Sequence, residues 1–194
     1  MSFPFNAALA RATLGLLFAL AGAQGLAARA PNDVEKTELT QRIGDFVAAN
    51  KERDYPKVIS FMPPRVIETF AGATKMQTDE LRMRLADAMR TVETKLKLID
   101  YKASADKATF KELPDGGVYA LVPTQATVDI EGKARVRNES WLIALRDLDR
   151  WYFVNADESN QVLILRKAYP EFATQDLPRG EMRLEKEQPG KNAK

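Results

Sequence analysis

Glu139 is the carboxylate in this sequence best placed to do chemistry. It stands two residues before Trp141 in a segment that the sequence predicts to be a β-strand, so both side chains would share one face. A carboxylate held out of water beside an indole ring has a raised pKa and could act as a general base. The competing interpretation is an ion pair with Arg137 or Lys133 at the exposed end of a hairpin, where strand charges usually pair.

Two further carboxylates lie in predicted strands, Asp100 and Asp129. Asp129 stands close to Gly132 and is typical of a residue that hydrogen-bonds within a turn. Asp100 is expected at a solvated position beside Tyr101. The candidate catalytic residues are therefore Glu139, Asp100 and Tyr101.

The composition excludes several other kinds of catalytic and metal-binding site. The chain has 194 residues, with no Cys and no His. Thiol nucleophiles, disulfides, thiolate metal sites and His-dependent triads are therefore excluded. Asp147-Leu148-Asp149 suggests a hard-cation site, but two carboxylates fall far short of the roughly six oxygen ligands that Ca²⁺ takes. The sequence predicts no metal and no cofactor.

The first residues read as a targeting segment. An apolar run over residues 12–21 follows Arg11, and Ala21-Gly22-Ala23 is an A-x-A cleavage pattern. We expect a signal peptide over residues 1–23, with cleavage as late as residue 30 as the alternative. The run is shorter than the roughly 18 apolar residues of a spanning helix, so no stable membrane anchor is expected after cleavage. The predicted location is periplasmic or secreted, in a bacterium.

Charge gives no indication of a nucleic-acid partner. The chain carries 29 Lys and Arg against 27 Asp and Glu. Basic residues are interleaved with acidic ones, so no positive field attracts a polyanion. Residues 173–194 are rich in charge, Pro and Gly, and we expect them to form a flexible charged tail.

The residues between these ends predict one domain, over 32–172. Apolar spacing of three and four indicates a helix over 38–50, another over 55–62 that Pro63-Pro64 ends, and a third from Thr78. Residues 65–70 add one more turn. Ser159 is expected to cap a short C-terminal helix over 160–169, with a strand at 162–165 as the alternative.

Between these helices the period drops to two, which indicates strands over 96–101, 108–113, 118–130, 133–146 and 150–156. With Glu131-Gly132 as a two-residue turn, Ile130 would oppose Lys133, and Val122 would face Trp141. Both faces of this hairpin are apolar at its far end. We therefore expect the second face to meet the C-terminal helix or another subunit.

The order of elements resembles the nuclear transport factor 2-like superfamily. The residues that carry the resemblance are Arg150-Trp151-Tyr152-Phe153-Val154, the ending from Leu165 to Tyr169-Pro170, and the opening helix with the break Asp54-Tyr55-Pro56. The resemblance implies an α+β fold in which three N-terminal helices pack on a curved antiparallel sheet to form a cone. It also implies an apolar pocket and, often, a dimer; Tyr55, Phe61, Val122, Trp141 and Phe153 are the expected pocket residues.

Fold alone does not choose the function. The leading hypothesis is an exported, non-catalytic module that binds a small apolar ligand or a protein and acts as a homodimer. The alternative is a carboxylate-dependent isomerase or lyase of the ketosteroid-isomerase type, with Tyr55, Tyr101 and Tyr119 as possible donors. The second alternative is an accessory or interaction protein of the cell envelope.

Overall fold

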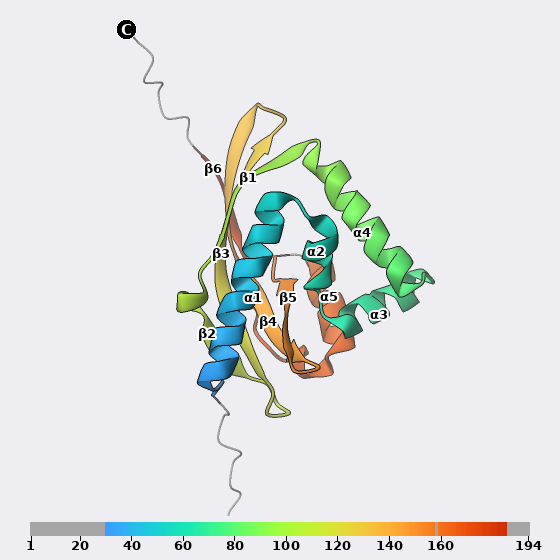
Figure 1. Ribbon diagram of the computed structural model, residues 1–194, viewed down its shortest axis with the longest axis vertical. Helices are drawn as coiled ribbons and strands as arrows, with labels where there is room; N and C mark the ends of the chain where they lie inside the picture. Colours follow the sequence, from blue (N-terminus) through green and yellow to red (C-terminus); the bar gives the residue numbers. More distant parts are fainter. Residues whose placement is uncertain (1–29, 158, 186–194) are drawn as a thin grey trace, which may run out of the picture.

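The computed structural model describes residues 30–157 and 159–185. The predicted signal peptide and residues 186–194 of the predicted tail lie outside them. The protein is α+β, with helices packed against a curved, antiparallel half-barrel sheet (Figure 1). Its elements are α1 (Asp33–Glu52), α2 (Tyr55–Ser60), α3 (Pro64–Thr74), α4 (Thr78–Glu93), β1 (Leu96–Ala103), η1 (Ala105–Lys107), β2 (Thr109–Glu112), β3 (Val118–Ile130), β4 (Ala134–Asp147), β5 (Arg150–Asn155), α5 (Ser159–Ala168), η2 (Pro170–Phe172) and β6 (Glu181–Leu184).

Helix α1 starts at Asp33, five residues before the predicted helix over 38–50, and a capping box precedes it. The Asn32 side chain accepts from the Glu35 backbone N–H at 2.8 Å, and the Glu35 carboxylate accepts from the Asn32 N–H at 2.9 Å. This capping box satisfies backbone donors that have no partner within the helix. The buried stripe of Leu39, Ile43 and Phe46 then packs on the sheet.

Four helices, not the three expected, precede the first strand of the described chain. The difference lies at Pro63-Pro64, which ends α2 as predicted but also begins α3. Pro64 occupies the first turn of α3, where a missing N–H and a fixed φ cost nothing. The helix then runs eleven residues and buries Val66, Ile67 and Ala71.

The strand order is β1-β3-β4-β5, with β2 also on β3 and β6 also on β4. Strands β1 and β2 therefore lie end to end along β3, separated by η1. Pro123 sits in this gap: its carbonyl accepts from Ser104 N–H at 3.0 Å, and its missing N–H would point the same way. The interruption of the neighbouring strand thus accommodates a proline in the middle of β3.

The predicted register of the β3–β4 hairpin is wrong by one residue. Ile130 opposes Ala134, so the loop contains Glu131, Gly132 and Lys133. Glu131 has φ 53° and Gly132 has φ 71°, and the Lys133 N–H closes on the Ile130 carbonyl at 2.8 Å. Positive φ at both residues is typical of a type I′ turn at Glu131-Gly132, and Lys133 is the extra residue that shifts the register.

The shift changes which side chains share a face. Val122 opposes Leu142 rather than Trp141, and Trp141 opposes Pro123. One face carries Ala120, Val122, Leu142 and Ala144 and packs under α1 and α2; the other carries Tyr119, Leu121, Ile143 and Leu145 and packs under α5 and η2. The C-terminal helix therefore covers the second apolar face.

The β4–β5 connection settles where the aromatic strand points. Asp147 opposes Arg150, which leaves a two-residue turn of Leu148 and Asp149 with φ 47° and 60°. Positive φ at both positions is typical of the type I′ turn, whose twist matches the flanking strands. Trp151 and Phe153 consequently face α1.

The predicted flexible tail differs from the structure over its first half. Residues 181–184 form β6, which pairs with β4 from Val136 to Glu139. Asp157 holds the approach to β6, because its carboxylate accepts from the Gly180 N–H at 2.8 Å and from Asn138 Nδ2 at 3.0 Å. The sequence does not predict this strand because the segment is rich in charge and Pro and because all side chains of the strand are exposed.

Candidate binding groove

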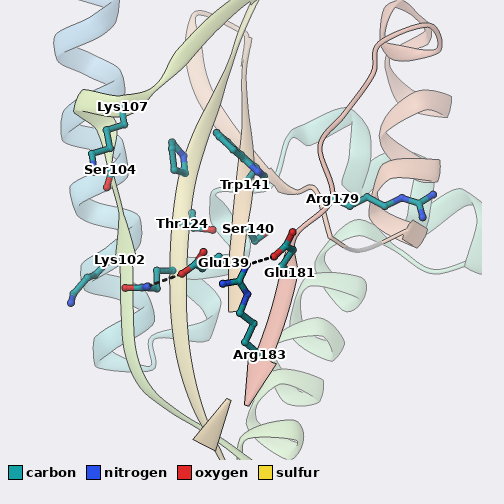
Figure 2. Close-up of a pocket in the computed structure, with 12 residues that line it drawn as sticks. Lys102, Ser104, Lys107, Thr124, Glu139, Ser140, Trp141, Arg179, Glu181 and Arg183 are labelled. Carbon is teal, nitrogen blue, oxygen red and sulfur yellow. Dashed lines mark hydrogen bonds and ion pairs between the residues drawn. The ribbon is translucent and has the colours of Figure 1, made fainter. Parts of the chain in front are cut away.

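A groove of about 550 Å³ lies on the sheet where the cover of α5 and η2 ends (Figure 2). Its volume falls within the roughly 300–1,000 Å³ of small-molecule sites. The lining comes from β1, η1, β3, β4 and the segment that leads into β6: Lys102, Ser104, Lys107, Pro123, Thr124, Gln125, Glu139, Ser140, Trp141, Arg179, Glu181 and Arg183.

Trp141 and Pro123 form the apolar part of this groove. They oppose each other across β3 and β4, and Trp141 is half-buried because it also packs against the core under α5. An indole face at the edge of a core has apolar surface available for stacking. The groove therefore offers a flat apolar surface next to charged groups.

Cations outnumber carboxylates around this surface. Lys102, Lys107, Arg179 and Arg183 line the groove, with Glu139 and Glu181 as the acidic residues. Arg183 pairs with Glu181 at 2.5 Å, as the dashed line in Figure 2 marks.

The other three cations differ in their partners. Lys102 pairs with Asp100 at 3.0 Å. Within the described part of the chain, Lys107 and Arg179 form no side-chain ion pair. The groove thus has a local positive excess in a chain of almost balanced charge.

Ser140 also lines the groove, and its buried hydroxyl oxygen has no hydrogen-bond partner among the described residues. Strand alternation places this side chain with Leu142, on the helix-covered face. The hydroxyl is neutral and adds no charge to the groove.

The structure places Glu139 in the groove but in an exposed position. Gln125 is its cross-strand neighbour on β3, and Gln125 Nε2 donates to its carboxylate at 3.5 Å. Glu181 of β6 lies opposite on the other side. Glu139 shares its face with Trp141, as the sequence predicts, but water reaches the carboxylate.

Asp129 and Asp100 are held by structural partners. Asp129 accepts from the Gly132 N–H at 2.6 Å, which is the predicted turn role. Asp100 pairs with Lys51 at 3.6 Å and Lys102 at 3.0 Å. The hydrogen bond from Lys102 lowers the pKa of Asp100, which makes this carboxylate a weaker base.

The tyrosines proposed as donors lie apart from Glu139. Tyr101 belongs to the cluster under α1, where burial raises its pKa. The hydroxyl of Tyr119 donates to Gln175 at 3.0 Å on the α5 side. The hydroxyl of Tyr55 donates to Glu93 in the helical layer, where burial and this carboxylate raise its pKa to about 12.

The expected pocket residues separate into three groups. Phe61, Val122 and Phe153 belong to the buried cluster under α1, Tyr55 to the helical cluster, and Trp141 to the opposite face. Rings fill the space beneath α1: the Phe61 and Phe153 centroids lie 5.8 Å apart, and Phe46 contacts both. Of the five expected pocket residues, Trp141 lines the groove and the other four form core.

A second pocket, of about 290 Å³, lies at the β4–β5 turn and contains two buried carboxylates, Glu35 and Asp147. Asp147 accepts from the Tyr169 hydroxyl at 2.7 Å and lies 3.4 Å from Arg65. Glu35 pairs with Arg146 and completes the α1 capping box. Both carboxylates thus join helix ends to the turn, and this arrangement accounts for their burial.

Two kinds of feature are absent from residues 30–157 and 159–185. No helix there is long and apolar enough to cross a membrane. No group of three or more acidic side chains in the same residues is arranged to hold a metal ion.

Comparison with known proteins adds no relative. No family model, no curated protein and no solved structure matches this chain. The likeness to the nuclear transport factor 2-like superfamily therefore stays one of element order and residue pattern.

Sequence reasoning missed the basic side of the groove. The composition predicts a flexible charged tail over Arg179, Glu181 and Arg183, and no sequence pattern connects Lys102 or Lys107 with that segment. The signal was present as alternation, since Arg179, Glu181, Arg183 and Glu185 stand at every second position around Met182 and Leu184.

Proposed function

We propose that this chain is an exported binding module and that its ligand is a small anion with a flat apolar part. The observation that carries the proposal is the half-buried Trp141 in one groove with Lys107 and Arg179, the two lining cations that form no ion pair among the described residues. Small-molecule sites combine apolar surface with a few charged groups that set orientation. An acidic ligand would meet both here.

The cone arrangement implied by the resemblance remains part of this proposal, with one change. The resemblance implies an apolar pocket inside the cone, and Phe61, Val122 and Phe153 are three of its five expected residues. Since these side chains pack against one another, we assign the ligand to the opposite face of the sheet. Export is proposed from the N-terminal apolar segment, and sequencing the N-terminus of the protein recovered from a cell envelope would test it.

The carboxylate-dependent isomerase is less well supported. Such an enzyme needs a carboxylate of raised pKa near a hydroxyl donor. Asp100 has a lowered pKa, and Glu139 is exposed on the face opposite to Tyr101. No feature of the described residues favours this alternative over binding.

A titration with two matched dyes tests the proposal. Anilinonaphthalene sulfonate carries an aromatic system and one negative charge, and N-phenyl-1-naphthylamine is its uncharged counterpart. We expect saturable binding of the sulfonate at one site, quenching or shift of the tryptophan emission, and weaker binding as salt rises. Equal affinity for both dyes would show that charge does not contribute, and would contradict the proposal.

A further inference from the structure

Strand β6 forms an open edge of the sheet in the described part of the chain. It pairs with β4 on one side and with no strand on the other. Met182 and Leu184 are 72% and 74% exposed, which is unusual for large apolar side chains in a strand. An edge strand with unpaired backbone groups is a template for another strand.

The backbone directions of β6 follow from one hydrogen bond. The Glu185 N–H donates to the Arg135 carbonyl of β4 at 2.9 Å. Because these directions alternate along a strand, Glu181 and Arg183 also face β4, and Met182 and Leu184 point their N–H and C=O groups outward. Any strand that adds to this edge must pair through Met182 and Leu184.

The side chains of the same segment alternate in charge. Arg179, Glu181, Arg183 and Glu185 fall on one face, and Gly180, Met182 and Leu184 on the other. This order makes the segment complementary to itself when it runs antiparallel. We propose that β6 pairs with β6 of a second copy of this chain, across a two-fold axis at Met182.

Charge selects this register from those that the backbone allows. With Met182 opposite its own copy, Glu181 faces Arg183 of the second chain, and Arg179 faces Glu185. Centring the axis on Arg183 or on Glu181 would instead place like charges opposite each other, which is destabilising. Centring on Gly180 or Leu184 keeps opposite charges together but shortens the overlap of the two strands.

The pairing would join the two half-barrel sheets edge to edge. The two Met182 backbones would exchange both of their N–H···O=C bonds, and the exposed methionines would contact each other on one face. Four-residue strands bury little area, well below the ~1,200 Å² of stable interfaces, so we expect a weak dimer. The inference does not depend on the ligand of the groove.

A charge-swap series measured without ligand tests the pairing. In the Glu181→Arg variant, the new arginine of each copy faces Arg183 of the other copy. In the Arg183→Glu variant, the new glutamate of each copy faces Glu181 of the other copy. Each single variant should therefore weaken association at least tenfold. The double variant Glu181→Arg/Arg183→Glu should restore it. Glu68→Arg on the exposed face of α3 changes net charge equally and should leave the dissociation constant unchanged.

Cysteine cross-linking reads the register directly, because the chain has no cysteine of its own. Glu181 and Arg183 of the two copies form a non-hydrogen-bonded pair with Cα atoms about 4.5 Å apart, a separation that a disulfide spans. A mixture of Glu181→Cys and Arg183→Cys chains should give mainly the mixed disulfide dimer. Mainly self-linked Arg183→Cys dimers, a monomer at about 1 mM in sedimentation, or a double swap that restores nothing would each overturn the proposal.

Discussion

The buried carboxylate of Asp147 accepts a 2.7 Å hydrogen bond from the hydroxyl of Tyr169. This bond joins the end of β4 to the residue that follows α5. Arg65 of α3 adds a cation above the Tyr169 ring, 4.7 Å from its centroid, and lies 3.4 Å from the carboxylate. Three separate elements therefore meet at one charged group.

Tyr169→Phe should lower the free energy of unfolding by about 1–3 kcal/mol, because Asp147 loses its neutral donor while remaining buried. Tyr152→Phe is the matched control, since the half-exposed Tyr152 should tolerate the loss of its hydroxyl within about 0.5 kcal/mol. Urea unfolding of both variants measures the difference. Equal stabilities would show that Asp147 does not need this hydroxyl.

Alkaline pH should destabilise the protein through its tyrosines. Burial is the largest cause that raises the pKa of Tyr55, Tyr101, Tyr119 and Tyr169. Between pH 10 and 12 the folded state keeps tyrosine protons that the unfolded state releases near pH 10. The contribution of these tyrosines to the free energy of unfolding is therefore fully present below pH 10 and declines as pH rises toward 12.

Tyr101→Phe isolates one of these contributions. The slope of unfolding free energy against pH between 10 and 12 should become shallower by up to about 1.4 kcal/mol per pH unit. A slope equal to that of the parent chain would show that Tyr101 ionises normally in the folded state.

Much of this architecture can be predicted from periodicity and end signals. The spacing of Leu39, Ile43 and Phe46 correctly predicts α1, and the shift to period two correctly predicts the strands that follow. The side covered by α5 also follows from the apolar character of both faces of the hairpin. These features depend on local pattern, which one sequence contains.

The register and the groove could not be predicted in the same way. Two- and three-residue turns at Glu131-Gly132 are both compatible with the residues, and one residue decides whether Trp141 faces Val122 or Pro123. The position of β6 depends on a contact between Asp157 and Gly180, 23 residues apart. Contacts between residues this far apart leave no local pattern in the sequence from which they could be predicted.

Glu35→Gln should lower the free energy of unfolding by about 1–3 kcal/mol, because it removes one buried partner of Arg146. Glu38 is the matched control: it also pairs with Arg146, at 3.7 Å, but its side chain is 30% exposed. Glu38→Gln should cost no more than about 0.5 kcal/mol. Thermal unfolding of the two variants measures both losses of stability. A larger loss for Glu38→Gln than for Glu35→Gln would contradict the view that Glu35 is the more important partner of Arg146.

Gly180→Ala should detach β6 from β4. A Cβ at this position would lie 2.3 Å from the Asp157 carboxylate, which must then move and release the Gly180 N–H. Hydrogen exchange of the amides of Glu181, Arg183 and Glu185, which face β4, should accelerate at least tenfold while the core stays protected.

Gly72→Ala provides the control for this substitution, because nothing lies within 4 Å of a Cβ there and the position is helical. It should leave exchange in β6 unchanged and raise overall stability by about 0.5–1 kcal/mol. Unchanged exchange in the Gly180→Ala variant would mean that Asp157 does not anchor the strand.

Affinity for anilinonaphthalene sulfonate in a lysine-neutralised groove tests the central claim most directly. Lys102→Gln/Lys107→Gln removes two lining charges, and Lys97→Gln/Lys111→Gln removes two charges from β1 and β2 outside the groove. The account predicts that the first pair weakens calorimetric binding at least fivefold, and that the second pair and the affinity for the uncharged dye change little. Equal effects of the two pairs would contradict it, because general attraction by surface charge would then explain the binding.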